Sequence, residues 1–375
     1  MKEQRLNQNR RGRWKNRLLS GALAVLLASS CLWASGCTSE PGGDVVNPTV
    51  AVAEGVALPR FDQEVLLCSD EAKQVYDRTM KIENAVATGA PYRPFVFEYQ
   101  LEQSGTLRLG LDSALADARE YPLDKANSSV IIDNLQTGST YHYQVEVAGN
   151  TYSGSFRTAV SNRYISIPGV ENLRDIGGYQ TLDGKTVKQG LLIRGCELDG
   201  IKNEDYLLAD EAVDSAKKTF GFVYDLDLRS PEIFEGEYVS PLGADVAHRF
   251  YDAPTYAQIF REEYLESMKQ IFSDLADPEK YPMYLHCTWG RDRTGTVVLL
   301  LQGLLNVSKE DLLREYRLTA YVNAPVATNT KMDALFLGLD SYEGDTLQEK
   351  IISYLTTTVG VTREQIQSIQ SIFLD

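Results

Sequence analysis

In the second half of the chain, short apolar runs alternate with longer stretches in which apolar residues recur every three or four positions. The runs have the length of buried strands, and the longer stretches have the period of amphipathic helices. The predicted elements are strands at 221–228, 246–251 and 281–285 and helices at 264–275, 296–305 and 309–321. Their alternation predicts an α/β fold with a central, mainly parallel sheet flanked by helices. Ligands bind such sheets at the carboxyl ends of the strands.

An earlier part of the chain alternates apolar and polar residues one by one. The alternation is unbroken over 141–147, which is typical of a half-buried strand. Further runs of strand length lie at 95–101, 106–111, 129–132 and 152–158. Short strands without helices between them predict a small all-β sandwich, which we place at 60–160. A helix capped by Ser69 is expected near its start, at 69–87.

The N-terminal residues have the order of charge and hydropathy that marks an export signal. Residues 2–17 contain seven basic side chains and one acid, and an apolar stretch of 16 residues follows at 18–33. Ala34-Ser35-Gly36-Cys37 then resembles a bacterial lipoprotein box. We therefore expect a signal peptide at 1–36, a lipid anchor on Cys37, a linker at 37–59 and an extracytoplasmic, membrane-anchored protein. The alternative is an uncleaved anchor, although a span needs about 20 residues.

Charge and cysteine content limit the partners of the mature chain. Without the signal it has 339 residues with 30 basic and 51 acidic side chains, a formal charge of −21. Such a surface repels nucleic acid, which is not an expected partner, and any attraction of a phosphate must be local. Besides the lipidated residue, only Cys68, Cys196 and Cys287 remain, which implies no disulfide framework.

One loop combines a cysteine with an arginine six positions later. It runs from His286 to Gly295 and lies between a predicted strand and a predicted helix. The backbone N–H groups of such a loop, together with the N-terminus of the helix, can surround one oxyanion. The predicted phosphate-binding residues are Thr288, Trp289, Gly290, Arg291, Asp292 and Arg293.

The same positive environment stabilises a thiolate at Cys287. Cysteines at helix N-termini beside cationic groups have pKa values of roughly 3.5–7.5 in place of about 8.5, so we expect a nucleophile here. Arg293 can bind two phosphate oxygens with its planar fork. His286 is expected to support the loop from behind, and the Thr294 hydroxyl to assist the breakdown of a phosphocysteine.

His-Cys-x5-Arg-Thr resembles the signature of the cysteine-dependent protein tyrosine phosphatases, and the ending Gly-Arg-Asp-Arg-Thr-Gly resembles their atypical bacterial branch. Further similar segments lie at 172–179, 190–194, 227–230 and 354–361. The resemblance spans about 165–375 and implies a phosphatase domain at 163–375 that works through a phosphocysteine intermediate, without metal or cofactor. The expected partners are phosphorylated proteins, phosphotyrosine above all, or small phosphate esters, with phosphoserine, phosphothreonine and phosphoinositides as further candidates.

Two residues of the loop depart from this branch. A small residue is usual where Trp289 stands, and lysine, which has been linked to phosphoinositide substrates, is usual where Arg291 stands. The resemblance therefore leaves the substrate range open. Trp289 can stack on a phenyl ring, cap the pocket or pack under the loop.

Three aspartates are candidates for the acid that protonates the leaving group. Asp292 lies within the loop and is the acid that the resemblance implies. Asp252 follows a predicted strand 35 residues before Cys287, where other phosphatase branches carry a mobile acid, and Asp227 ends another predicted strand. We expect Asp292, with Asp252 as the alternative acid.

Other functions are compatible with parts of the sequence. The strand-end pair Asp225 and Asp227 is similar to the nucleophile and magnesium site of haloacid-dehalogenase-like enzymes, but Arg229 stands where that pattern has threonine or valine. A phytase-like inositol phosphate hydrolase would share the cysteine chemistry. A surface protein that binds phosphorylated ligands without turnover is the non-enzymatic alternative.

The predicted sandwich has a signature of its own. The segment 135–141 resembles the tyrosine corner of fibronectin type III domains, in which the tyrosine hydroxyl bonds back to the preceding turn. We therefore expect a fibronectin type III-like domain in which Tyr141 makes this bond. No cluster of residues within it suggests chemistry, which favours a role in spacing or docking.

Overall fold

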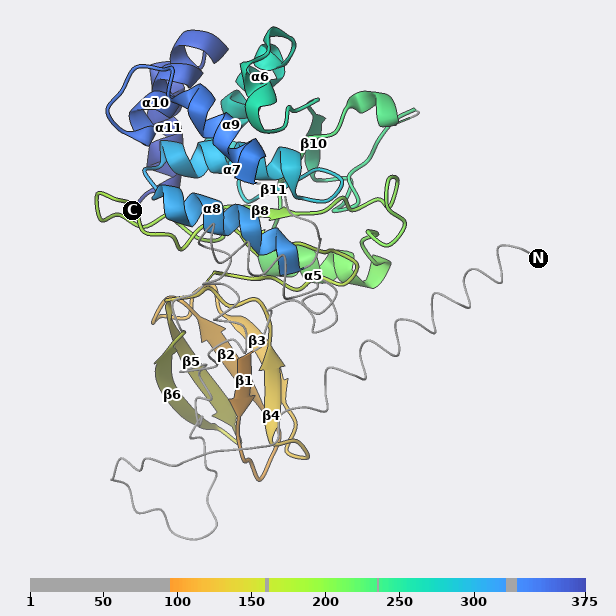
Figure 1. Cartoon of the computed structure of the whole chain (residues 1–375). Helices are drawn as coiled ribbons and strands as arrows, with labels where there is room; N and C mark the ends of the chain where they lie inside the picture. The colour runs from red at the N-terminus through yellow and green to blue at the C-terminus, as the bar shows by residue number, and fades with distance from the viewer. Residues whose placement is uncertain (1–94, 159–161, 235, 322–328) are drawn as a thin grey trace, which may run out of the picture. The chain divides into compact units, whose positions relative to one another are not determined.

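The computed structural model describes residues 95–158, 162–234, 236–321 and 329–375, in which antiparallel sheets precede an α/β part (Figure 1). The first strands are β1 (Phe95–Glu98), β2 (Gly105–Gly110), β3 (Arg119–Leu123), β4 (Ser129–Ile132), β5 (Thr140–Val147) and β6 (Asn150–Arg157). β1 pairs with β4, and the other four form a sheet in the order β3-β2-β5-β6. Phe97 and Ile132 of the small sheet share one buried core with Leu107 and Val145 of the larger sheet. The predicted all-β sandwich is therefore present.

The tyrosine that ends the predicted corner makes the expected bond. The Tyr141 hydroxyl accepts a hydrogen bond from the backbone nitrogen of Gln136 at 2.8 Å. The edge strand β3 was absent from the sequence expectation. Only Leu123 of its five residues is buried, and Pro122 interrupts the pattern, so the segment contains no apolar run that would predict a strand.

The α/β part is built on a five-stranded sheet with the order β10-β9-β11-β8-β7. Its strands are β7 (Arg174–Asp175), β8 (Leu192–Gly195), β9 (Tyr224–Asp227), β10 (Ala247–Phe250) and β11 (Met283–His286). The last four strands run parallel, and only the edge strand β7 is antiparallel. β8, β9 and β11 are buried at every position, as parallel strands are when helices cover both faces of the sheet.

β11 comes last in the sequence but lies in the middle of the sheet. After β8 the chain leaves the neighbouring position in the sheet empty and forms β9 and β10. It then returns, and β11 fills the position between β8 and β9. Such a reversal of strand order opens a crevice beyond the carboxyl end of the strand concerned. Cys287 follows β11 directly, so the topology places it at this crevice.

Helices cover both faces of this sheet. They are α5 (Asp210–Phe220), α6 (Leu265–Leu275), α7 (Asp292–Leu304), α8 (Lys309–Arg317), α9 (Asn329–Leu339), α10 (Leu347–Tyr354) and α11 (Arg363–Phe373), with short segments η1 (Pro231–Ile233), η2 (Tyr256–Phe260), η3 (Glu262–Tyr264), η4 (Pro278–Lys280), η5 (Leu318–Tyr321) and η6 (Leu355–Val359). α5 packs on the face that presents Ile193 and Tyr284, whereas α7 packs on the face that presents Leu192 and Leu285. Figure 1 shows α5 and α7 on opposite sides of the strands.

The sequence pattern located some helices and missed others. α6 and α8 agree with the predictions within a residue at their start, but α7 begins at Asp292 rather than at 296. Its first turn is made of polar loop residues that carry no apolar period. α5 was missed because Ala212, Ala216 and Phe220 are its only buried residues, and two alanines make a weak apolar stripe. Asp183-Gly184, a pair typical of tight turns, forms a turn that Gln180 and Thr186 flank as a bridged pair.

Several expectations fall on residues that the structure leaves undescribed. The signal at 1–36, Cys37 with its linker, Cys68 and the helix at 69–87 all lie outside the described ranges. Within those ranges, no helix combines the length and the hydropathy that a membrane crossing requires.

Candidate active site

The loop between β11 and α7 turns sharply at Gly290. This residue has a φ of +60°, a left-handed conformation that favours glycine. A Cβ atom at this position would lie 2.2 Å from the carbonyl oxygen of Gly195, at the end of β8. The neighbouring strand thus limits how the loop can close, and only a residue without a side chain fits.

Cys287 lies at the base of this loop with 3% of its surface exposed. Burial alone raises the pKa of the thiol, but the Arg293 charge, the Thr294 hydroxyl and the backbone N–H groups of Thr294 and Arg291 lower it by more. The Thr294 hydroxyl is buried and has no other hydrogen-bond partner among the described residues, which leaves it to the sulfur. The resulting pKa lies below that of an ordinary thiol, as a nucleophile requires.

Arg293 lies in the first turn of α7 and extends along the loop. Its Nη1 donates to the backbone oxygen of Leu228 at 3.4 Å, and its Nη2 donates to Thr288 Oγ1 at 3.5 Å. Both bonds are long and use neutral acceptors. The guanidinium charge is therefore available to an anion held in the loop.

Buried side chains hold the outer side of the loop. Asn172 Nδ2 donates to the backbone oxygens of Trp289 at 3.0 Å and of Gly290 at 2.9 Å, and Arg194 Nη2 donates to the same Gly290 oxygen. These bonds draw the carbonyl groups outward. The N–H groups on the opposite sides of the peptides are then free to face an anion inside the loop.

Glu315 on α8 neutralises two arginines behind the loop. Its Oε1 accepts from Arg174 Nε at 2.7 Å, and its Oε2 accepts from Arg194 Nη1 at 2.6 Å. Burial, together with the nearby Arg174 charge, lowers the pKa of Arg194 to about 10, and the charge of Glu315 opposes this shift. One carboxylate therefore makes it possible to bury both guanidinium groups that support the loop.

We expect Glu315→Gln to lower the free energy of unfolding by about 3–5 kcal/mol, because it leaves two buried cations without a counter-charge. Glu315 is 1% exposed, so water cannot replace the lost interaction. Urea unfolding of the variant measures the effect. Asp340→Asn, which removes one partner of an exposed ion pair with Lys350, is the control and should leave the unfolding midpoint unchanged. Equal stability of the two variants would contradict this account of the loop.

His286 is the last residue of β11 and is fully buried directly before the loop. Its Nε2 lies 3.0 Å from Asp225 Oδ1, and its Nδ1 lies 3.3 Å from the backbone oxygen of Cys287. Burial lowers the pKa of His286, but the charges of Asp227 and Asp225 raise it to about 9. The ring is therefore protonated at neutral pH and forms a buried ion pair with Asp225. Its Nδ1 contacts the first peptide of the loop.

Asp225 and Asp227 serve as buried counter-charges. Asp225 Oδ2 accepts from Ser240 Oγ at 2.6 Å while its other oxygen faces His286. The two Asp227 oxygens accept from Arg229 Nε at 2.9 and 2.8 Å. These partners favour a structural role for both residues. They disfavour Asp227 as a proton donor, and they disfavour an aspartyl nucleophile with a magnesium ion at this pair.

Asp292 is the first residue of α7, and its carboxylate is half-buried between two partners. Arg291 donates to both oxygens, from Nε at 3.1 Å and from Nη2 at 3.0 Å, and the Tyr256 hydroxyl donates to Oδ1. The alternative acid, Asp252, has an exposed side chain on the segment that leads from β10 into η2. That segment therefore delivers a tyrosine hydroxyl to the acid within the loop.

Comparison with known proteins agrees with this geometry. The pattern that defines the tyrosine phosphatase family matches residues 165–375, more than half of the chain. The chain belongs to the tyrosine phosphatase family. A candidate tyrosine-protein phosphatase of Cupriavidus necator is 28% identical over 177 positions, which take in 39% of this chain and 59% of that protein. The chain thus spans less than two thirds of that relative. The family is one of cysteine-based phosphatases.

Trp289 of the phosphatase stands beside the loop rather than under it. Its side chain is 40% exposed, and its ring meets Tyr206 edge-on with 5.4 Å between the centroids and an interplanar angle of 88°. The ring is therefore held in place by one aromatic neighbour while part of it remains open to solvent. Burial beneath the loop, one of the three expectations for this residue, is wrong.

Sequence reasoning missed most of the residues that support the loop. Asn172, Arg174 and Arg194 lie in segments that carried the family resemblance, but they had been given no role. Nothing in the sequence singled out Glu315 or Tyr256. Their partners, Arg174 and Asp292, are distant in the chain, and only the fold brings each pair together.

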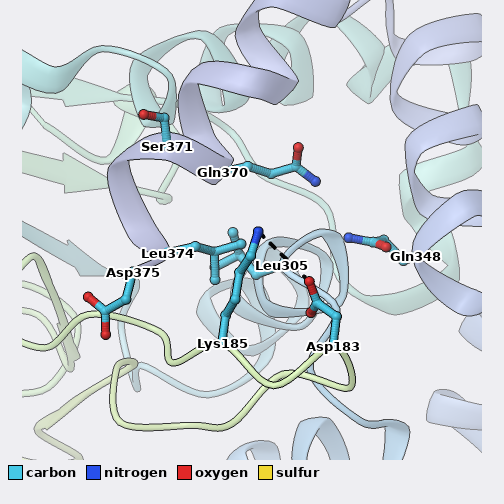
Figure 2. A pocket seen from close by; sticks show the side chains of 8 residues that line it. All are labelled: Asp183, Lys185, Leu305, Gln348, Gln370, Ser371, Leu374 and Asp375. Atoms are coloured by element: carbon cyan, nitrogen blue, oxygen red, sulfur yellow. Dashed lines mark ion pairs between the residues drawn. The ribbon is translucent and has the colours of Figure 1, made fainter.

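A polar pocket of about 320 Å³ lies at the other end of α7 (Figure 2). Lys185 and Asp183, two positions apart on one turn that lines it, form an ion pair at 3.8 Å, and Leu305, which follows the C-terminus of α7, lines it as well. Cys287 precedes the N-terminus of this helix, whose 13 residues span roughly 20 Å. The pocket contains no nucleophile of the kind found in the loop and is separate from the active site.

The lowered pKa of Cys287 predicts how alkylation of the phosphatase depends on pH. The thiolate persists below the ordinary thiol pKa of about 8.5, so iodoacetamide should already reach its full inactivation rate at a pH below that value, and inorganic phosphate should protect the protein. The inactivation rate, measured from residual activity, should fall only as the pH drops through the lowered pKa. A rate that rises tenfold per pH unit up to about pH 8.5 would indicate an ordinary thiol.

Proposed function

We propose that the protein is an exported phosphatase that hydrolyses phosphate monoesters, phosphotyrosine above all, through a phosphocysteine intermediate. The observation that carries this proposal is the buried Cys287 thiol, whose pKa is lowered, in one loop with Arg293. The outward-facing carbonyls of Trp289 and Gly290 leave the inside of the loop to N–H donors. This arrangement suits a tetrahedral dianion better than a neutral or cationic ligand.

The reaction follows from these positions in two steps. The Cys287 thiolate attacks phosphorus, the bond to the ester oxygen breaks, and Asp292 transfers a proton to the leaving alcohol. A water molecule then attacks the phosphocysteine, Asp292 takes up the proton, and inorganic phosphate and the thiolate are released. Arg293 binds the equatorial oxygens in both steps. The Thr294 hydroxyl, which faces the sulfur, stabilises the thiolate as it leaves.

Phosphotyrosine is our preferred substrate because the exposed Trp289 ring offers an aromatic wall at the rim of the loop. Phosphoserine, phosphothreonine, phosphoinositides and inositol phosphates remain substrates of the same chemistry. A competition panel of phosphotyrosine peptides, phosphoinositides and inositol phosphates separates them. The phosphotyrosine peptides are expected to have the highest kcat/KM of this panel, and preference for inositol phosphates would indicate a phytase-like enzyme.

The central test is hydrolysis of an aryl phosphate by the full chain in the presence of EDTA. The proposed chemistry uses Cys287 and Arg293 as its reactive groups, so turnover should continue after chelation. Binding of phosphopeptides without turnover would indicate a surface protein that recognises phosphorylated ligands. Activity that is lost in EDTA and restored by magnesium would favour Asp225 and Asp227 as the reactive pair.

We further propose that the enzyme is tethered outside the cytoplasm by acyl chains on Cys37, and that its sandwich is a fibronectin type III-like spacer. The basic and apolar order of the N-terminal residues supports the first point, and the bond between Tyr141 and Gln136 supports the second. Cys37→Ala should release the protein from the membrane fraction. An unchanged membrane fraction without lipid mass on residue 37 would indicate an uncleaved anchor.

A further inference from the structure

Tyr256, the first residue of η2, is fixed to the first turn of α7 at both its backbone and its side chain. Its backbone nitrogen donates to Thr296 Oγ1 at 2.8 Å, and that hydroxyl donates to the backbone oxygen of Asp292 at 2.8 Å. Its side-chain hydroxyl donates to the Asp292 carboxylate. The tyrosine is thus held against the candidate acid from two directions.

The backbone of Tyr256 adopts a conformation that a tyrosine does not choose by itself. Its φ is +49°, in the left-handed region, although the residue has a bulky side chain and is 6% exposed. Such conformations persist only where the surroundings fix them, and they cluster at functional sites. Here the fixing contacts are those to Thr296 and Asp292.

A second tyrosine sets the direction of the hydrogen bonds. The Tyr256 and Tyr316 hydroxyl oxygens lie 2.6 Å apart. A hydroxyl has one proton to donate, so while Tyr256 donates to Asp292, Tyr316 must donate to Tyr256. Burial and the neighbouring Tyr316 and Asp292 raise the pKa of Tyr256, so its hydroxyl retains the proton that it donates.

Arg291 is the other partner of this carboxylate. It donates to Oδ1 and Oδ2 from the adjacent position in the chain, whereas Tyr256 engages Oδ1 alone. Without the tyrosine, Arg291 would be the one remaining partner given for this carboxyl group among the described side chains. Oδ2 accepts from Arg291 Nε and Nη2, whereas Oδ1 is also held by Tyr256 from η2, so the carboxyl group is fixed from two sides.

We propose that Tyr256, supported by Tyr316, is a positioning residue that directs Asp292 toward the leaving oxygen of the substrate. The proposal rests on the proposed function, because it assigns a role within the same reaction. Tyr256 itself does not touch the reacting atoms. It acts by restricting the orientation of the acid, so its loss should affect only the reactions that depend on that acid.

The test compares Tyr256→Phe with wild type on phenyl phosphate, which has a poor leaving group, and on dinitrophenyl phosphate, which departs without help. We expect kcat/KM, which reports formation of the phosphocysteine, to fall by about tenfold or more on the first ester, the effect of one hydrogen bond to a charged group, and by less than about twofold on the second. Tyr316→Phe should show the same selectivity to a smaller degree. Tyr281→Phe is the control. It removes the hydrogen bond from the Tyr281 hydroxyl to the Leu275 backbone oxygen, near the end of β11 that is far from Cys287, and it should match wild type on both esters.

A double variant gives the strictest readout. Tyr256→Phe combined with Asp292→Asn should be no slower on phenyl phosphate than Asp292→Asn alone, because the two residues act as one unit. Equal losses on both esters, or additive losses in the double variant, would reduce Tyr256 to general support of the loop and overturn the proposal. If Asp292→Asn shows a strong leaving-group dependence and Tyr256→Phe shows none, the positioning role fails while the proposed function stands. A wild-type chain that hydrolyses neither ester overturns both.

Discussion

Replacement of Cys287 by serine should lower kcat by on the order of 10⁴-fold or more, since the reaction loses its nucleophile, while inorganic phosphate still binds. The affinity should survive because the groups that face the anion are Arg293 and backbone N–H donors rather than the sulfur. Turnover of an aryl phosphate and calorimetric titration with phosphate measure the two effects separately.

Cys196→Ser is the matched control for this variant. Cys196 is buried, burial raises the pKa of its thiol, and its sulfur accepts a hydrogen bond from the Glu171 nitrogen at 3.1 Å that a serine oxygen can also accept. Its activity should equal that of the wild type. Full activity in the Cys287 variant, or equal losses in the two variants, would contradict the phosphocysteine mechanism.

The second large effect concerns the proton of the leaving group. Asp292→Asn should slow esters of poor leaving groups by roughly 10²–10⁴-fold and activated aryl esters far less, because only the former need an acid. The dependence of kcat/KM, which reports formation of the phosphocysteine, on the pKa of the leaving alcohol should become steep in this variant when it is measured over a series of aryl phosphates.

Asp252→Asn provides the comparison that decides between the two acids. Its side chain is exposed, whereas the Asp292 carboxylate is bonded within the loop to Arg291 and Tyr256. The Asp252 variant should therefore keep the shallow dependence of the wild type. If it shows the steep dependence and the Asp292 variant loses only phosphate affinity, the acid lies on the segment before η2 and Asp292 holds the loop in shape.

The elements that the sequence predicted best are those with a local physical cause. The period of apolar residues located α6 and β11 because burial on one face, or on both, depends on spacing along the chain. The same reasoning failed for β3 and α5, where few side chains are buried and the pattern is correspondingly weak. Those elements are stabilised by neighbours in space rather than by their own pattern.

The residues that give the loop its chemistry are also local in the sequence. Cys287 and Arg293 meet around Gly290 because a glycine turn and the start of a helix bring positions six apart together. The backbone donors belong to the same ten residues. The sequence by itself therefore determined the α/β setting of this loop and placed in it the residues that we propose as nucleophile and phosphate-binding arginine.

Tertiary structure alone decided how that loop is held and how its acid is oriented. Glu315 is 121 positions from Arg194, Asn172 is 117 positions from Trp289, and Tyr256 is 36 positions from Asp292. The sequence permits many partners for a buried charge, and the order of the strands selects one of them. Tyr256, which follows Asp252 by four positions, contacts Asp292 for the same reason. The packing of η2 against α7, rather than any local preference of the sequence, directs the Tyr256 hydroxyl toward the loop.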